Sequence, residues 1–398
     1  MTGTGVTENA GRRTANGGRP LGLYVHVPFC ASICGYCNFN RGLFDAPLVA
    51  AYVAAVAGEI RRAPAGLAAD TIYFGGGTPS LLEPAEIGAL VRACRERFEV
   101  ADGAEVTLEA NPETVSEASL AACRREGVNR VSFGVQSFRD EELKRLGRAH
   151  TAARARAAFA EARRAGFDNV SLDLMLWLPG QTVAHLETSV DALLELDPEH
   201  ASVYLLELYP NAPLRESMAR AGWSLAPDDD AADMYVRVME RLEAAGFEQY
   251  EISNLAKPGR RSRHNLKYWT DGEWLGFGPG AHSTHRRVRW NNVTGTAEYT
   301  RRIQASETVV AVRRPLSARE ALEEALFMGL RLSEGVSVAA LREAHGVDIW
   351  ATFGERLEPA VAAGLLVHED GRLRLTRPGM LMANEVMGAF LPADSTVE

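Results

Sequence analysis

The chain has 398 residues, 46% of them hydrophobic and 24% charged, an ordinary globular composition that is sufficient for one large domain and a smaller one. A net charge of -9 argues against bulk binding of nucleic acid, and no apolar run approaches the roughly 18 residues of a membrane span. Five cysteines, three of them clustered, do not suit a disulfide framework. We therefore expect a cytoplasmic protein whose thiols bind metal, with no nucleic-acid partner and no stable membrane insertion.

The first part of the chain predicts a tail followed by a repeating strand and helix pattern. Residues 1–19 are rich in Gly, Thr, Asn and Arg and lack the apolar core of a signal peptide, so we interpret them as a disordered tail. From residue 20 to 250, apolar β-branched runs alternate with helical patterns, which indicates a parallel sheet with helical crossovers. The six predicted strands are centred near residues 24, 73, 108, 133, 173 and 205.

Alternation within these strands favours a barrel over an open, doubly wound sheet. In the first strand Leu23, Val25 and Val27 share one face, whereas Tyr24 and His26 share the other. A sheet covered by helices on both faces would be apolar throughout. One apolar and one polar face instead predict an α/β fold with a partial (β/α)6 TIM-like barrel, whose polar lumen binds a ligand at the C-terminal ends of the strands.

The remainder of the chain predicts two further parts. Residues 251–310 mix loops with short strands, and we interpret them as an extension of the barrel that carries the stretch "HNLKYW". Residues 311–390 combine helical patterns with a hairpin that turns at Asp370-Gly371, which predicts a small winged-helix-like domain. Because the chain is acidic, we expect this domain to pack on the barrel as a lid rather than to bind nucleic acid.

A cluster of cysteines directly follows the first predicted strand. Cys30, Cys34 and Cys37 have the spacing C-x3-C-x2-C, and three thiolates can hold three irons of a [4Fe-4S] cubane while the fourth iron stays open. The alternative is a zinc site completed by a histidine such as His26, although no second CxxC pair exists. The motif resembles that of the radical S-adenosylmethionine (SAM) superfamily. That resemblance implies that the open iron binds SAM and that the cluster cleaves it to a 5′-deoxyadenosyl radical.

Further segments narrow this resemblance. The stretches "RPLGLYVHVPFC", "YFGGGTPSLL", "EANPE", "GVNRVSFGVQSF", "LGRAH" and "SLDLMLWLPGQT" resemble the coproporphyrinogen III oxidase (dehydrogenase) family and its relatives over about residues 19–380. Residue types at the predicted strand ends suit a SAM site, because glycines let the backbone approach a ligand and carboxylates accept hydrogen bonds from ribose hydroxyls. The resemblance implies that SAM is contacted by Tyr24, Gly76, Gly77, Thr78, Glu109, Gln136, Arg148 and Asp173.

Two features bring the chain nearer to the haem-chaperone (HemW-type) branch of this family than to the oxygen-independent oxidases. The oxidase motif adds a cysteine two residues after the third one, where this chain has Phe39. The stretch "HNLKYW" matches the chaperone signature HNxxYW, which implies haem binding by His264. The nearby Arg260, Arg261 and Arg263 suit the haem propionates. The alternative is a structural histidine beside solvated arginines.

We therefore expect a radical-SAM-type [4Fe-4S] protein that binds haem and transfers it to acceptor proteins, with flavodoxin or ferredoxin as reductant. The alternative function is oxidative decarboxylation of coproporphyrinogen III in porphyrin biosynthesis. A third function, radical chemistry on an unrelated substrate, follows from Trp177, which stands where the family often has Tyr-Gly. No catalytic residue is assigned.

Three other residues are singled out by their types. Cys94 and Cys123 lie in helical patterns with apolar neighbours, and we expect both to be buried structural thiols. His282 is a loop histidine that suits the wall of a SAM or haem pocket, and a structural role suits it equally.

Overall fold

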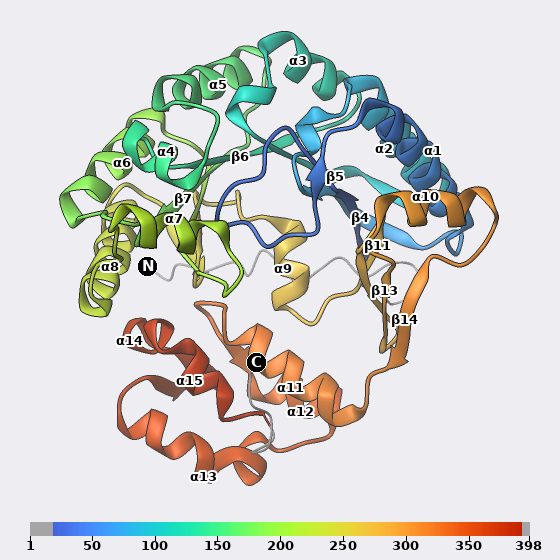
Figure 1. The fold of residues 1–398 in the computed structure, drawn as a ribbon. Coiled ribbons are helices and arrows are strands. Elements are labelled where there is room, and N and C mark those ends of the chain that lie inside the picture. Colours follow the sequence, from blue (N-terminus) through green and yellow to red (C-terminus); the bar gives the residue numbers. More distant parts are fainter. Residues whose placement is uncertain (1–18, 392–398) are drawn as a thin grey trace, which may run out of the picture.

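The computed structural model describes residues 19–391, and a curved sheet dominates it (Figure 1). Neighbouring core strands are parallel and follow one another in chain order, so the predicted partial (β/α)6 barrel is confirmed. The predicted tail, residues 1–19, lies outside the described residues except for Arg19. The core strands are the six predicted ones: β1 (Leu21–Val27), β4 (Ala68–Gly76), β5 (Glu99–Ala110), β6 (Arg130–Gln136), β7 (Val170–Leu176) and β8 (His200–Leu205).

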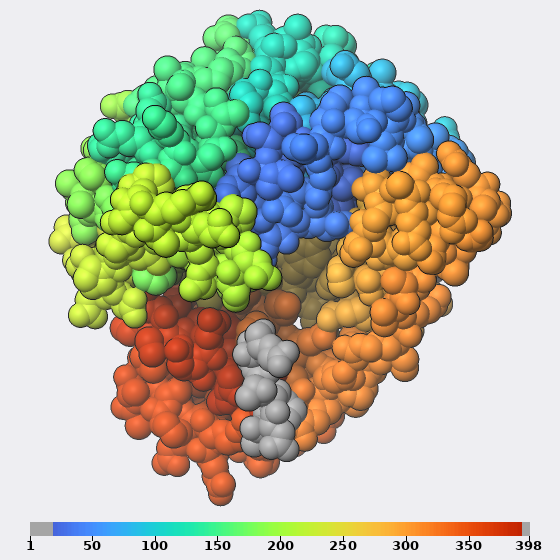
Figure 2. Space-filling model, viewed as in Figure 1, coloured from blue at the N-terminus to red at the C-terminus, as the bar shows by residue number. Residues whose placement is uncertain are grey.

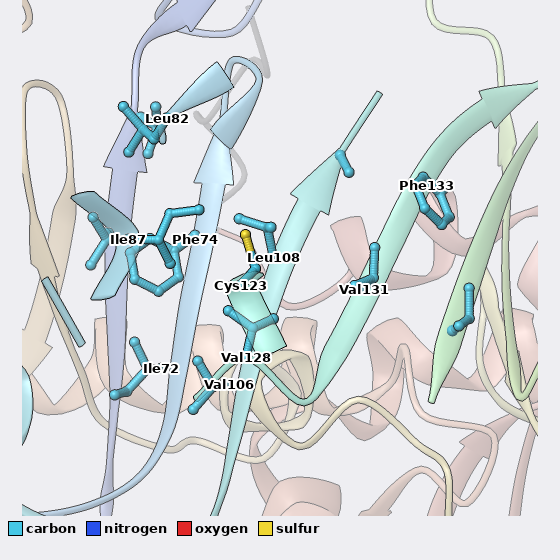
Figure 3. Packing of buried hydrophobic residues seen from close by; sticks show 14 of the residues in the cluster. Ile72, Phe74, Leu82, Ile87, Val106, Leu108, Cys123, Val128, Val131 and Phe133 are labelled. Carbon is cyan, nitrogen blue, oxygen red and sulfur yellow. The ribbon is translucent and has the colours of Figure 1, made fainter. Parts of the chain in front are cut away.

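Helices cover the outer face of the barrel because the strands direct their apolar side chains outward. Ile72 and Phe74 of β4 lie beside Val106 and Leu108 of β5, and Ile87 packs on them (Figure 3). Burial of such apolar surface is the main favourable term in folding. The covering helices are α1 (Ala46–Arg62), α2 (Pro84–Arg97), α3 (Glu117–Arg125), α5 (Ala152–Arg164), α6 (Val183–Leu196) and α8 (Asp228–Ala244), with the shorter α4 (Asp140–Leu146) and α7 (Pro213–Ala221) near the rim.

Short strands extend the sheet beyond both edges of the barrel. On one side β11 pairs parallel with β1, and β12, β13 and β14 follow in antiparallel order, with α10 packed against α1. On the other side β10 and β9 continue from β8. These elements are β9 (Glu248–Glu251), β10 (Asn254–Ala256), β11 (Trp274–Phe277), β12 (His282–His285), β13 (Val288–Asn292), β14 (Val310–Pro315) and α10 (Thr296–Gln304). A separate pair, β2 (Phe29–Cys30) and β3 (Gly42–Leu43), closes the cysteine loop.

The C-terminal domain has a hydrophobic core of its own and lies across the open side of the barrel (Figure 1). Its predicted hairpin is confirmed, because Asp370 and Gly371 adopt φ angles of 51° and 71° between β16 and β17. The domain is built from α11 (Ala318–Gly329), α12 (Val338–His345), α13 (Ile349–Ala362), α14 (Arg377–Leu381), α15 (Ala383–Gly388) and a sheet of β15 (Val336–Ser337), β17 (Arg372–Leu375) and β16 (Leu366–Glu369). Helices packed with a small hairpin sheet agree with the winged-helix-like prediction.

One short helix, α9 (Arg263–Trp269), closes the N-terminal end of the barrel. Its first two backbone amides donate to the carboxylate of Glu105 on β5, each over 3.0 Å; they belong to Arg263 and His264. In Figure 2 the molecule is hollowed between the yellow-green and orange segments that flank the opening of the barrel. None of the helices within residues 19–391 is long and apolar enough to cross a membrane.

A buried ion pair joins the barrel to the C-terminal domain. Glu251 of β9 is 0% exposed and accepts a hydrogen bond of 3.1 Å from Arg331, two residues after the end of α11. Beside the pair, the backbone amides of Ile252 and Ser333 donate to the carbonyls of Arg331 and Tyr250, both at 3.0 Å. Burial raises the pKa of Glu251, and Arg331 opposes that rise.

Arg331→Met should therefore destabilise the protein by about 3–5 kcal/mol at pH 8, because it leaves a buried carboxylate unpaired. At pH 5 the loss should be smaller, because the orphaned carboxylate can take up a proton. Urea denaturation followed by circular dichroism at both pH values measures it. Arg342→Met is the control, since Arg342 and its partner Asp348 are both exposed. Equal losses of unfolding free energy in the two variants would show that this ion pair does not stabilise the contact between the barrel and the C-terminal domain.

Candidate cofactor site at the mouth of the barrel

The cysteine loop lies at the C-terminal end of β1, where a barrel of this class places its chemistry. The backbone amides of Gly77 and Thr78, which follow β4, donate to the carbonyl oxygens of Val27 and Phe29, each over 2.7 Å. These bonds connect the loop after β1 to the turn after β4. The two segments that the sequence singled out are therefore held as one unit.

Glycine is required in this turn because the chain passes close to β1. Gly76 has a φ of 113°, and a Cβ there would lie 2.5 Å from Cε1 of His26. A Cβ on Gly77 would lie 2.6 Å from the carbonyl oxygen of Phe29. The residue types predict that these glycines let the backbone approach a ligand, whereas the space that a Cβ would occupy is filled by the protein itself. Gly76, Gly77 and Thr78 nevertheless line the cavity described next.

Cys30, Cys34 and Cys37 line one wall of a cavity of about 400 Å³. All three thiols are free, and burial raises the pKa of Cys30. Among residues 19–391, no three His, Cys, Asp or Glu side chains converge on one point as they would around a single ion. A cubane does not need such convergence, because each of its cysteines holds a different iron. The arrangement of the three thiols is therefore compatible with the predicted cluster.

Arg148 connects the cysteine loop to the sheet. Its guanidinium donates to Sγ of Cys34 at 3.4 Å, and to Oδ1 of Asn111 and the carbonyl of Gly134 at 2.6 Å each. These bonds hold the side chain of Cys34 against the ends of β5 and β6. The predicted site residue Arg148 is therefore placed at the cavity, with a role towards Cys34 that the sequence did not suggest.

Two partly buried carboxylates, Glu109 and Asp173, line the cavity on the side of the sheet. Glu109 accepts hydrogen bonds from the hydroxyl of Tyr73 at 2.7 Å and the amide of Gly76 at 3.1 Å. Burial raises the pKa of Glu109 to about 7, with a further rise from the nearby charge of Asp173. Burial likewise raises the pKa of Asp173 to about 6. Negative charge is therefore costly here near neutral pH, and a cationic ligand or a set of hydroxyl donors would lower that cost.

Arg130 supplies the positive charge that these carboxylates face, and it was not predicted. Its side chain is fully buried, and its charge opposes the rise in pKa of both Glu109 and Asp173. The signal was present in the sequence, because Arg130 falls on the same face of β6 as Ser132 and Gln136. Arg130 is the first residue of β6 and directly precedes the alternating residues on which the strand prediction depended.

The two remaining residues predicted to contact SAM, Gln136 and Tyr24, lie in different places. Gln136 lines the cavity and adopts a φ of 70°, a left-handed conformation that a non-glycine residue rarely takes. Tyr24 is not among the lining residues. Its hydroxyl instead contacts Nδ1 of His26 at 3.1 Å, and its ring stacks on that of Tyr73. The structure thus brings seven of the eight predicted SAM contacts to one cavity and leaves Tyr24 beneath it.

Comparison with known proteins reports two family regions in the chain. Residues 24–193 match the radical SAM superfamily, and residues 316–382 match the HemN C-terminal domain. The chain is 38% identical to the heme chaperone HemW of Bacillus subtilis, over 92% of this chain and 98% of that protein. It is 39% identical to the heme chaperone HemW of Mycobacterium tuberculosis, over 94% of this chain and 95% of that protein. The chain belongs to the HemW family of the radical SAM superfamily.

The fold of this HemW-family member also has a solved relative. Coproporphyrinogen III oxidase (HemN) from Escherichia coli, described as a radical SAM enzyme, superimposes with a TM-score of 0.82 at 24% sequence identity, over 94% of this chain and 90% of that one. The likeness confirms the partial barrel with its additional C-terminal domain. Membership of the radical SAM superfamily implies a [4Fe-4S] cluster and SAM as cofactors. The donor set agrees, since three free thiols and two partly buried carboxylates line one cavity.

His264, the residue expected to bind haem, lies at the opposite end of the barrel from the cysteines. It is 1% exposed, and its ring contacts Oγ1 of Thr71 through Nδ1 at 2.8 Å and the hydroxyl of Tyr268, also on α9, through Nε2 at 2.9 Å. Burial lowers its pKa to about 3, so the ring is neutral. With both nitrogens engaged, this conformation leaves no lone pair for iron. These contacts favour the structural alternative for His264.

The three arginines near His264 already have partners. Arg260, Arg261 and Arg263 form ion pairs of 3.4, 3.3 and 3.3 Å with Asp168, Glu248 and Asp70 respectively. They are spread over separate carboxylates and do not converge on one ligand. A role for this run in binding propionates is therefore not favoured.

Several residues at the cavity were missed because they lie in loops or at strand ends. Trp177 is absent from the cavity wall, and its indole donates to the carbonyl of Ala226 at 2.8 Å. Cys94 and Cys123 are buried in the core, as predicted. The missed lining residues that carry polar groups include Tyr36, Asn38, Asn111, Ser132, Tyr204, Glu207 and Tyr209. Of these, Ser132 lies on the same polar face of β6 as Gln136, so strand alternation could have indicated it.

The raised pKa of Glu109 predicts a pH-dependent stability for the cofactor-free protein. The folded state binds this proton more tightly than the unfolded chain does. The contribution is therefore complete below about pH 4.5 and is lost as the pH rises to about 7. Relative to Glu109→Gln, the wild type should lose on the order of 3 kcal/mol of unfolding free energy across that interval. Urea titrations at several pH values measure the difference. The surface variant Glu117→Gln should run parallel to the wild type, and a parallel Glu109→Gln profile would contradict the prediction.

Proposed function

We propose that this protein is a haem chaperone that holds a [4Fe-4S] cluster and SAM at the mouth of its barrel. The observation that carries the proposal is likeness to heme chaperones of the HemW family over 92% of the chain. Phe39 supports it, because this residue replaces the additional cysteine of the oxidase motif. Its side chain is 63% exposed at the edge of the cavity.

The lining residues divide between the two cofactors. Cys30, Cys34 and Cys37 would hold the cluster, and Arg148 would position the side chain of Cys34. Glu109 and Asp173 would accept hydrogen bonds from SAM, with Gln136 and the backbone of residues 76–78 beside them. When bound, the two cofactors supply reductive cleavage of a sulfonium bond. The chain's own part is to position them, exclude water and keep the carboxylates partly protonated until SAM arrives.

Oxidative decarboxylation of coproporphyrinogen III is the second candidate function. The likeness to HemN favours it, but at 24% identity that likeness concerns the fold. The two functions need the same cluster and the same lumen, so the geometry of the barrel does not separate them. A chaperone requires a haem site and acceptor proteins. Its cluster would accept electrons from a reductant such as flavodoxin or ferredoxin.

We retain the cytoplasm as the predicted compartment.

The cofactor assignment is tested by one variant on each side of the cavity. After anaerobic reconstitution the wild type should contain about four irons per chain, and Cys34→Ala should retain little iron. Asp173→Asn should keep its iron and bind SAM more weakly by about 1–3 kcal/mol, because one charged hydrogen-bond acceptor is lost. Iron analysis and calorimetric SAM titration measure the two effects.

Matched controls are available elsewhere in the barrel. Cys94→Ala removes a thiol buried in α2, and Asp168→Asn changes an exposed carboxylate just before β7. Both should behave like the wild type. Stoichiometric zinc without sulfide in the native protein would overturn the cluster assignment. Unchanged SAM affinity in Asp173→Asn would remove that residue from the SAM site.

The choice between chaperone and oxidase is tested with the reconstituted wild type. It should bind haem and transfer it to a haem-free acceptor, as followed by the Soret band. With coproporphyrinogen III, SAM and reductant under anaerobic conditions, chromatography should detect no multiple turnovers to protoporphyrinogen. Repeated turnover without haem binding would replace the chaperone proposal with the oxidase.

A further inference from the structure

A second cavity, of about 880 Å³, lies between the barrel extension and the C-terminal domain. Its walls come from the segment joining α9 to β11, from β12 and β13, and from α11 and α12. It shares no lining residue with the cysteine cavity. The volume falls in the range of roughly 300–1,000 Å³ that small-molecule and cofactor sites occupy. The roles assigned above leave this cavity unused.

One wall of this second cavity is aromatic. Tyr268, Trp269 and Trp274 line it, and the rings of Tyr268 and Trp274 meet edge to face at 4.7 Å. Nε1 of Trp269 is buried without a hydrogen-bond partner among the described residues. The Tyr and Trp of the stretch "HNLKYW" thus face this cavity, while its histidine faces the barrel. Met328 and Leu341 line the cavity as well, so a flat apolar ligand would be enclosed by apolar and aromatic side chains.

His345, the last residue of α12, is the unexplained polar group of this cavity. Its side chain is 2% exposed, and neither ring nitrogen has a hydrogen-bond partner within residues 19–391. Nε2 lies 3.9 Å from the carboxylate of Asp271. Burial lowers the pKa of His345 although Asp271 opposes that effect, so the ring is neutral at pH 7 and retains a lone pair. At 3.9 Å the Asp271 carboxylate makes no hydrogen bond to the ring, so both nitrogens of this buried side chain are open to a ligand.

Two arginines at the same place lack a carboxylate of their own. Arg19 and Arg287 donate to the backbone carbonyls of Thr270 and Ala344 at 2.8 and 3.2 Å. Neither is held in an ion pair within the described part of the chain, and both lie near enough to Asp271 to oppose the rise in pKa that burial causes there. By contrast, Arg289 in the same wall is bound to Glu324 at 2.6 Å. Arg19 and Arg287 are therefore available to two carboxylates of a ligand.

We propose that the second cavity is the haem site, with His345 as the iron ligand and Arg19 and Arg287 as the partners of the two propionates. The proposal rests on the haem-chaperone function proposed above and names where the cargo binds. Haem combines the features that the cavity matches: a flat apolar ring, two carboxylates at one edge and a metal that imidazole ligates. In this arrangement His264 is a structural residue that supports the aromatic wall through Tyr268.

Haem titration of the full-length protein, read as a Soret difference spectrum, tests the site. His345→Ala should shift the Soret band and weaken binding at least about tenfold, which corresponds to about 1.4 kcal/mol. Arg19→Ser combined with Arg287→Ser should weaken binding while the band stays in place, because the iron ligand is retained. His368→Ala is the matched control, an exposed histidine on β16 of the same domain, and should bind like the wild type.

A blocking variant protects the test against a His345 variant that fails to fold. Ala340 is an exposed α12 residue that lines the cavity, so Ala340→Trp should fill the space without removing a contact. It should reduce haem binding as strongly as His345→Ala does. If the wild type binds haem and both variants, folded by circular dichroism, bind it equally well, this site is wrong while the chaperone function stands. If the wild type itself binds no haem, the function and the site both fail.

Discussion

Buried charge in the lumen is the constraint on which the rest of the barrel depends. Arg130 is fully buried on the inner side of the sheet, and the partly buried Glu109, Asp173 and Arg148 line the cavity there, where an unpaired ion is costly. Opposite charges, hydroxyl groups and backbone amides compensate them from neighbouring strands. This compensation requires each strand to keep one polar and one apolar face, and the apolar faces in turn require helices outside. The chemistry of the site and the architecture of the fold therefore follow from one alternation.

That alternation is also why the sequence predicted the barrel so well. The six core strands, the helices between them and the hairpin at Asp370-Gly371 all follow from local patterns of period 2 or 3.6 or from turn chemistry. The strands β9 to β14 were not predicted individually, because they are short and rich in polar residues. They exist through pairing with neighbours, as Trp274 with Thr284 does. Tertiary context, which local patterns do not contain, decides such elements.

In the site as well, the sequence predicted what local patterns determine and missed what contacts between distant residues determine. Resemblance and strand alternation placed Glu109, Gln136 and Asp173 correctly around one cavity. The motif HNLKYW indicated that His264, Tyr268 and Trp269 act in one place. It did not indicate in which direction each side chain points. The direction of His264 is set by Thr71, which is 193 residues away in the chain. For Gly76 the residue type was meaningful, but the neighbour that requires it is His26, which only the structure reveals.

A column of side chains runs from one cavity to the other. Glu109 bonds to Tyr73, Tyr73 stacks on His264 at 5.0 Å, His264 contacts Tyr268, and Tyr268 meets Trp274. Close packing of this kind leaves no passage for a diffusing molecule. The contacts made by α9 thus separate the second cavity from the cysteine cavity. Under the proposed assignment, haem and SAM would therefore occupy sites that these packed side chains keep apart.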